Sequence, residues 1–245
     1  MSVIDGLLES EAAQWIVGQI DNLPNRAKFR AFNSLRSLQW ASRIYDAGMP
    51  IPACFCALHA TEEAVASFVS CAKVSGYSAA KQINIHDHRA KSVVSLMAQK
   101  VSEMMAEFKL AVAVDKKTDT LALRFMIEGV AHYRNASASV FHFRDEQENF
   151  LTDFYEELVG TFENIDALRN AVERGQIARN EIFYASSNGY PSGFVYPEAS
   201  LKRECQISIG LIWAALDVDA NKSKLIPLIQ QSIQTTNLVI AQFQK

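Results

Sequence analysis

Residues 41–76 read ASRIYDAGMPIPACFCALHATEEAVASFVSCAKVSG, and this stretch decides the fold. On both sides of the segment GMPIP, apolar residues recur at steps of three and four, which is the spacing of one face of an α-helix. Proline removes a backbone donor and restricts the residue before it, so GMPIP must end or redirect the first helix. The stretch therefore predicts two consecutive helices. The first is marked by Leu35 to Tyr45, and the second runs from about Ala53 to the region of Gly76, where glycine suits a helix end.

The same spacing continues along most of the chain, which contains only ten glycines and six prolines. Pro197 is expected near the start of a helix because its missing N–H costs nothing in the first turn. A loop rich in turn-forming residues, SSNGYPSGFVYP, ends at this proline. The further helices predicted from the spacing lie at about 86–114, 119–140, 145–174, 176–185, 197–216 and 223–243. No internal repeat or linker divides the chain. The sequence predicts one all-α domain over residues 1–245, a helical bundle with additional N-terminal and middle helices.

The composition limits the classes of protein to which the chain can belong. With 245 residues, of which 49% are hydrophobic, it can bury a substantial core. Its net charge of −3 gives no overall attraction for nucleic acid, so any such contact requires a local basic patch. The acidic start MSVIDGLLESEAA and cysteines without a C-x-x-C pair predict a reduced, cytoplasmic setting. The uncharged run at 205–216 is about half a membrane span, so we expect a buried helix and no transmembrane segment.

Glu62 occupies an apolar position of the second predicted helix. At about 100° per residue it falls between Leu58 and Val69, and His59 and Glu63 flank the same face. A lone buried carboxylate costs on the order of several kcal/mol or must hold a proton, so Glu62 should meet a cation or donors from another helix. Two interpretations remain open. Glu62 belongs either to a polar pair that fixes a helix crossing or to a functional site.

The segment HDHRAK, residues 86–91, gathers ionisable side chains at the start of the third predicted helix. Helical periodicity places His86 on the same side as Val93, whereas His88 and Lys91 point to the other side. Because the two histidines diverge, a helical H-x-H cannot chelate one metal ion. We expect His86 to be a core imidazole. His88 and Lys91 require either a second contact surface or a helix that begins after them.

An alternative enzyme class follows from the dipeptide His86-Asp87. Metal-dependent HD phosphohydrolases use such a pair, with an upstream histidine such as His59 and a downstream aspartate such as Asp115. This alternative requires ligands from three helices to converge. The chain shows no glycine-rich phosphate loop, nucleophile elbow or dinucleotide-binding fingerprint.

Three segments taken in order carry a family resemblance: ASRIYDAGMPIPACFCALHATEEAVASFV at 41–69, HDHRAK at 86–91 and RNEIFYASSNGYPSGFVYPEASLKRE at 179–204. They resemble the abortive-infection AbiV branch of the HEPN superfamily over about residues 30–220. The pattern consists of a helix ending in a small-residue turn, a helix with paired acids, an H-x-x-K element, and an R-x-x-x-x-Y element before a proline-containing loop. The residues that the resemblance places in a site are Glu62, Glu63, His88, Lys91, Arg179, Asn180 and Tyr184. This chain departs from the family at Ala66 or Ser67, where many relatives carry a lysine.

The resemblance implies a four- or five-helix HEPN-like bundle that forms a homodimer. Many HEPN proteins are metal-independent ribonucleases with an R-x4-6-H motif, in which arginine binds the phosphate and histidine moves the proton. Here Tyr184 stands in the histidine's place after Arg179, and a tyrosine with a pKa near 10 is a poor base at neutral pH. We therefore expect a defence or toxin-type protein that acts on RNA or the translation machinery, with or without cleavage. The alternatives are a non-catalytic HEPN interaction module and the HD-type phosphohydrolase. We expect no cofactor, metal or DNA partner.

The expected homodimer also has support from the sequence itself. The run at 205–216 is apolar on most sides of a helix, so it needs cover from two directions.

Overall fold

The fold is built mainly from helices, with one small sheet. A computed structural model describes residues 3–107, 110–181 and 197–243. The helices are α1 (Val3–Leu8), α2 (Glu11–Gln19), α3 (Asn25–Asp46), α4 (Pro50–Val74), α5 (His88–Glu107), α6 (Tyr155–Gly160), α7 (Ile165–Glu181), α8 (Pro197–Ala220) and α9 (Pro227–Phe243). The strands are β1 (Ala111–Asp115), β2 (Thr120–Ile127) and β3 (Val130–Asn135), and short 3₁₀ turns lie at Ile20–Asn22, Ser78–Gln82 and Ala138–Val140.

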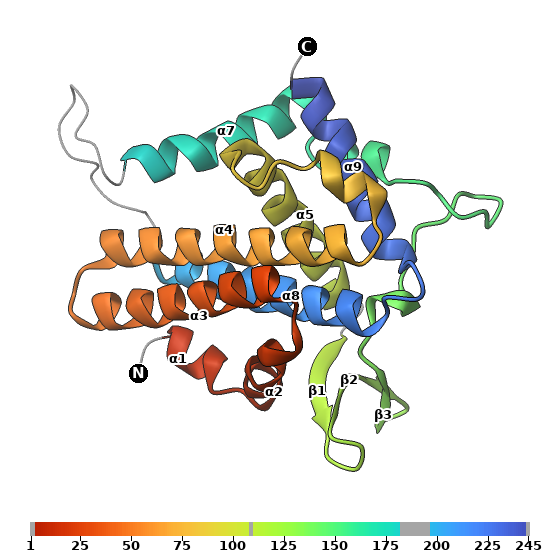
Figure 1. Cartoon of the computed structure of the whole chain (residues 1–245), viewed down its shortest axis with the longest axis horizontal. Helices are drawn as coiled ribbons and strands as arrows, with labels where there is room; N and C mark the ends of the chain where they lie inside the picture. The colour runs from red at the N-terminus through yellow and green to blue at the C-terminus, as the bar shows by residue number, and fades with distance from the viewer. Residues whose placement is uncertain (1–2, 108–109, 182–196, 244–245) are drawn as a thin grey trace.

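The two helices predicted around GMPIP form an antiparallel hairpin of α3 and α4 (Figure 1). Gly48 has a φ of +79°, a conformation that favours glycine, and it lies in the turn between them. α4 begins at Pro50, earlier than predicted, because prolines are tolerated in the first turn of a helix. The order and approximate bounds of this helix pair are confirmed.

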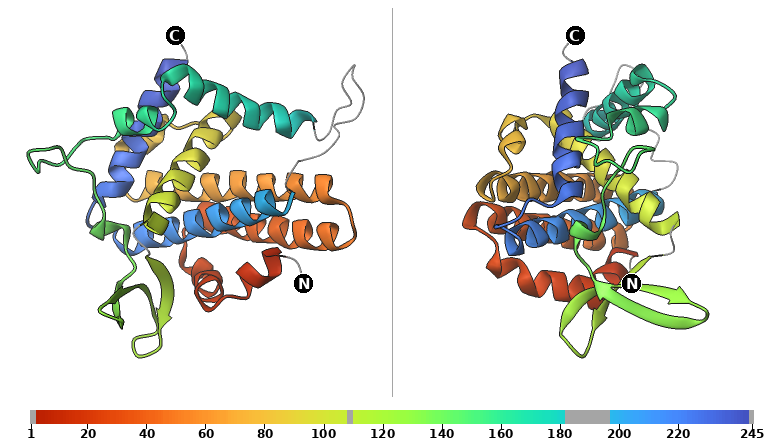
Figure 2. Two further views of the ribbon diagram at one scale, coloured as in Figure 1. Left: turned by 180° about the vertical axis from the view of Figure 1, so that it is seen from behind. Right: turned by 90° about the vertical axis from the view of Figure 1, so that its right-hand side faces the viewer.

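α4 lies at the centre of the helical packing, in contact with α3 and with α8. α3 and α4 lie on the near side of Figure 1 with α8 behind them, and the view from behind in Figure 2 shows α8 in front. Most of α4 is buried, and small side chains such as Ala57, Ala60 and Ala64 let its neighbours approach closely. α5 packs against α4, α7 and α9 and adds a further layer.

α5 differs from its prediction at both ends. The Asp87 carboxylate accepts the backbone N–H of Arg89 at 2.8 Å, which caps the helix so that it begins at His88. His86 lies before the cap and is exposed, so the expectation of a core imidazole is wrong. The predicted helix begins two residues too early. α5 also ends at Glu107, and β1 follows at 111–115 instead of more helix.

The middle helix predicted at 119–140 is wrong, because this segment forms most of an antiparallel sheet with the order β1-β2-β3. Ala113 pairs with Ala122, and Phe125 pairs with His132. Glu128 and Gly129 both have positive φ, as a two-residue hairpin turn between β2 and β3 requires. The sheet lies below the helices in Figure 1.

The other predictions for the chain have mixed outcomes. The additional N-terminal helices are present as α1 and α2. The helix predicted at 145–174 is wrong before residue 155, and the rest is divided between α6 and α7. The start of α8 at Pro197 is confirmed, and the turn-rich loop before it lies outside the described residues.

The buried face of α8 receives its cover from the same chain. Its buried residues include Ile207, Leu211 and Ile212, and α8 packs against α4, α1 and α5. The apolar character of 205–216 therefore does not by itself require a second copy. Within the described ranges, no helix is both long enough and apolar enough to cross a membrane.

Candidate functional site

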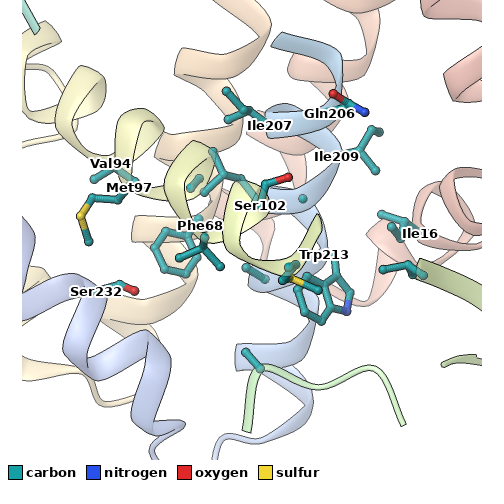
Figure 3. Close-up of a pocket in the computed structure, with 18 of the residues that line it drawn as sticks. Ile16, Phe68, Val94, Met97, Ser102, Gln206, Ile207, Ile209, Trp213 and Ser232 are labelled. Atoms are coloured by element: carbon teal, nitrogen blue, oxygen red, sulfur yellow. The ribbon is translucent and has the colours of Figure 1, made fainter. Parts of the chain in front are cut away.

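Two cavities of similar volume lie among the helices, and they differ in chemistry. The first has a volume of about 470 Å³ and is lined from α2, α4, α5, α8 and α9. Figure 3 shows Phe68, Met97 and Trp213 around it. None of the described residues that line this cavity carries an Asp, Glu, Lys, Arg or His side chain. Its wall therefore supplies neither a base nor a cation for phosphate.

The second cavity has a volume of about 460 Å³ and is lined by residues of α4, α5, α7 and α8. Its wall includes basic, acidic and hydroxyl side chains from segments far apart in the chain. The polar and charged residues that line it are Thr61, Glu62, His88, Lys91, Ser92, Ser95, Gln99, Arg174, Arg203 and Glu204. Acid–base groups and cations that share one cavity make it the candidate functional site.

Glu62 links α4 to the first turn of α5. Its Oε1 lies 2.9 Å from His88 Nδ1, and its Oε2 lies 3.6 Å from Lys91 Nζ. Helical periodicity predicts that His88 and Lys91 lie on the same side of α5. In the structure α4 provides the contact surface for these two residues. Glu62 thus meets partners from another helix, as the cost of a lone carboxylate on an apolar face requires.

The geometry assigns distinct roles to the two nitrogens of His88. An ionised Glu62 can only accept a hydrogen bond, so Nδ1 must carry the proton that it donates. In a neutral imidazole Nε2 then keeps its lone pair and can accept a proton from a ligand. The His88 side chain lines the cavity and is 45% exposed, whereas the Lys91 side chain is only 10% exposed. His88 therefore places at this cavity a nitrogen that is able to accept a proton, and Lys91 places an ammonium group in its wall.

A second polar group in the same cavity was missed by sequence reasoning. Glu204 is 4% exposed, and its Oε2 accepts the Thr61 hydroxyl at 2.7 Å. Its Oε1 accepts hydrogen bonds from Nε and Nη2 of Arg203 at 3.0 and 2.8 Å. Ser208 Oγ lies 3.1 Å from Thr61 Oγ1. Thr61 directly precedes Glu62, so the two groups are adjacent on α4. The sequence signal was an acid directly before the uncharged run at 205–216.

The other residues predicted for the site are not all brought to it. Glu63 points to α3, where Oε1 lies 3.6 Å from Arg30 Nη1, so the two neighbouring acids have different partners. The backbone of Arg179 and Asn180 lies in α7, and their side chains are not among those described. Tyr184 lies outside the described residues.

The two positions at which the sequence departs from the AbiV-like pattern lie in the core. Ala66 and Ser67 are both fully buried, and the Ser67 hydroxyl donates to the Ala27 carbonyl at 2.8 Å. A lysine at either position would begin in this buried region, where an ammonium group without a partner is costly. The small side chains of Ala66 and Ser67 suit this closely packed position.

The residues named for an HD-type metal site have other neighbours. The His59 ring stacks on Phe55 with centroids 6.5 Å apart, and Asp87 caps α5. Asp115 accepts the backbone N–H of Lys117 at 2.9 Å in the β1–β2 turn. In the described part of the chain, no three His, Cys, Asp or Glu residues form a group able to hold a metal ion.

The fold and the cavity define a mostly helical protein with a polar site between four helices. A comparison of the chain with protein-family models, curated proteins and solved structures found no match.

Proposed function

We propose that this chain is a HEPN/AbiV-like defence or toxin-type protein that acts on RNA, and that it cleaves RNA without a metal ion at the cavity of Glu62, His88 and Lys91. One observation carries the proposal. A half-exposed imidazole, oriented by a carboxylate at 2.9 Å, shares a cavity with Lys91, Arg174 and Arg203. RNA cleavage needs a group that titrates near neutral pH and cations that stabilise the phosphate charge.

The proposed reaction uses His88 for both proton transfers. Nε2 accepts the proton of a ribose 2′-hydroxyl, and the 2′-oxygen attacks the adjacent phosphorus. The bond from phosphorus to the 5′-oxygen breaks, and the imidazolium returns the proton to that oxygen. The products are a 2′,3′-cyclic phosphate and a 5′-hydroxyl end. The Lys91, Arg174 and Arg203 cations compensate the negative charge that develops on the phosphate.

In the proposed reaction His88 transfers the proton, whereas the family motif suggests the position of Tyr184 for this role. The resemblance places Arg179 and Tyr184 where relatives carry arginine and histidine. His88 is a better proton carrier at neutral pH than a tyrosine. Under the proposal, Arg179 remains a predicted phosphate ligand. α7 supports this prediction because its residues Ala171 and Arg174 line the cavity.

The test is cleavage of a labelled single-stranded RNA by the purified chain in the presence of EDTA. His88→Ala is expected to lower the rate by about 10²- to 10⁴-fold, the usual range for general acid–base catalysis. His86→Ala is the matched control, because His86 is exposed and lies before the helix cap. The 2′,3′-cyclic phosphate end is identified by mass spectrometry. Absence of cleavage by the folded wild type, or equal rates in His88→Ala, rejects the proposal.

A second candidate, the non-catalytic interaction module, is favoured by one observation. Glu62 already contacts both His88 and Lys91. These contacts alone suffice to hold α4 and α5 together, with no catalytic role for the three side chains. This candidate predicts that Arg179→Ala and wild type both leave total RNA intact. It also predicts that substitution of Glu62 changes stability alone.

A further inference from the structure

The outer face of α3 carries a row of basic, aromatic and amide side chains. We call it the α3 stripe, and its members are Arg26, Phe29, Asn33, Arg36, Trp40 and Arg43. Their spacing alternates between three and four residues, which keeps them on one side of a helix. The opposite side of α3 is buried against the rest of the chain through residues such as Ala31 and Leu38. From Arg26 to Arg43 the stripe is about 25 Å long at ~1.5 Å per residue.

The aromatic members of the stripe face solvent. Phe29 is 66% exposed and Trp40 is 46% exposed, and the neighbouring Phe32 is also exposed. Single exposed apolar residues are common on proteins, but several in line on one helix indicate a binding surface. The Arg36 guanidinium lies 5.0 Å from the centroid of the Trp40 ring, and its Nη2 donates to Asn33 Oδ1 at 2.6 Å. This pairing presents a planar cation beside an exposed indole.

α3, the helix that carries the stripe, is a basic segment in a chain with a net negative charge. Within Asn25–Asp46 the sequence has five Lys or Arg residues and one acid, Asp46, although the whole chain has a net charge of −3. Lys28 and Arg30 have carboxylate partners in Asp21 and Glu63. Among the described residues, the three arginines of the stripe have no carboxylate within ion-pair distance. Their charges are therefore available to an anionic ligand.

The α4 side adds positive charge to one end of the stripe. Burial lowers the pKa of Lys73 on α4, and the nearby charge of Arg26 lowers it further. The Lys73 ammonium itself donates a hydrogen bond to the Ile83 carbonyl at 2.8 Å, so it adds charge near Arg26 without being a member of the stripe. Glu63, also on α4, is already paired with Arg30.

We propose that the α3 stripe binds single-stranded RNA, with Phe29 and Trp40 stacking on bases and the arginines contacting phosphates. Alternating aromatic and basic side chains are the usual features of a surface that binds single strands without reading sequence. A second copy of the chain is a poorer occupant, because two copies of the stripe across a twofold axis place arginines against arginines. The proposal takes its ligand class from the proposed function. The stripe residues are not among those that line the His88 cavity, so binding and cleavage can be tested separately.

The experiment measures fluorescence anisotropy of a labelled polyuridine RNA in EDTA, with all proteins in the His88→Ala background so that the RNA stays intact. Trp40→Ala is expected to weaken binding about 10-fold, within the range for loss of one base–aromatic stack. Replacing Arg26, Arg36 and Arg43 together by alanine is expected to reduce the slope of log K against log salt by about 2, since each phosphate contact contributes about 0.7. Trp40→Phe is expected to restore most of the affinity lost in Trp40→Ala.

A matched control exists elsewhere on the surface. The Arg144 guanidinium lies 4.7 Å from the ring centroid of exposed Phe150, so the double variant Arg144→Ala, Phe150→Ala removes a similar pair far from α3 in the chain. It is expected to bind as its parent does. An equal loss in this control overturns the proposal, as does equal affinity for duplex RNA of the same length. Loss of self-association in Trp40→Ala during sedimentation, without loss of RNA binding, assigns the stripe to a homodimer instead. Stripe-dependent binding by a wild type that does not cleave supports this proposal while rejecting the catalytic one.

Discussion

His88 Nδ1 lies 2.9 Å from Glu62 Oε1, although the two residues are 26 positions apart in the chain. The same carboxylate lies 3.6 Å from Lys91 Nζ through its other oxygen. One acid therefore orients an imidazole that faces the cavity and compensates an ammonium in its wall. The contact connects the central helix α4 to the first turn of α5, so site geometry and helix packing depend on the same side chain.

The first prediction concerns Glu62→Gln. The amide removes the negative charge beside Lys91, which is 8% exposed, and leaves an uncompensated cation in the wall. We expect the free energy of unfolding to fall by about 1–3 kcal/mol, measured by urea denaturation. Glu103→Gln is the control, because the exposed pair with Lys100 at 2.9 Å should contribute less than about 1 kcal/mol. Equal effects of the two substitutions contradict the buried role of the Glu62 pair.

The second prediction concerns the pH dependence of stability at Asp217. Burial raises the pKa of this carboxyl group, and hydrogen bonds from the Ala138 N–H and the Ser137 hydroxyl only partly oppose the rise. The folded state therefore binds the proton more tightly than the unfolded state. Its stabilising effect is complete below the ordinary aspartate pKa of about 3.9 and is lost as pH rises through the folded pKa. We expect the unfolding free energy of wild type, minus that of Asp217→Asn, to decrease over this range.

Asp145 supplies a control of opposite sign for that experiment. Its pKa is lowered, first by the side-chain amide of Asn149 and then by the Asn149 backbone N–H. Its contribution is present above the ordinary aspartate pKa and is lost as pH falls through the folded pKa. The difference between wild type and Asp145→Asn should therefore increase with pH. The same sign for both aspartates, in urea titrations at several pH values, is inconsistent with the burial of Asp217.

The sequence predicted the helices best where one face is buried and where glycine or proline residues mark the helix ends. The turn at 47–49 is marked by Gly48 and prolines, and α3 and α4 follow from it. The hairpin of β2 and β3 was missed because most of it is exposed, so its strands show no strict alternation of apolar and polar residues. Gly129 was the available signal, because glycine favours the positive φ that it adopts in this turn, whereas Glu128 is not a residue typical of such turns.

The site was predictable only in part, because its partners come from several helices. Glu62 was identified because a carboxylate on an apolar face requires a partner, and His88 and Lys91 are those partners. The sequence gives no reason to prefer Glu62 to Glu63. The turn of about 100° per residue, however, directs Glu63 to α3 and Arg30. Glu204 carried no comparable signal, because its burial depends on the crossing of α8 with Thr61 of α4. Helical periodicity identifies a face, whereas the helix that covers it is set by tertiary packing.

The third prediction concerns the reactivity of the cysteines. Burial raises the pKa of Cys54 to about 11, and that of Cys71 and Cys205 to about 12. Burial also raises the pKa of Cys56, but that residue is partly exposed. Because the thiolate is the reactive form, iodoacetamide at pH 8 should label Cys56 first, as followed by peptide mass spectrometry. In denaturing urea all four should react at similar rates. Labelling of Cys71 or Cys205 as fast as Cys56 in the native protein contradicts their burial.

The fourth prediction isolates the buried hydroxyl of Thr61. Thr61→Val keeps the side-chain size but removes the donor that lies 2.7 Å from Glu204 Oε2, in a carboxylate that is only 4% exposed. We expect a loss of about 1–3 kcal/mol in unfolding free energy, because a buried acceptor is left without its hydrogen bond. Thr61→Ser keeps the hydroxyl and removes one methyl group, which costs about 0.8 kcal/mol. Urea denaturation of both variants therefore separates the contribution of the hydrogen bond from that of packing. A larger loss of unfolding free energy in Thr61→Ser than in Thr61→Val assigns the stability of this position to the methyl group instead.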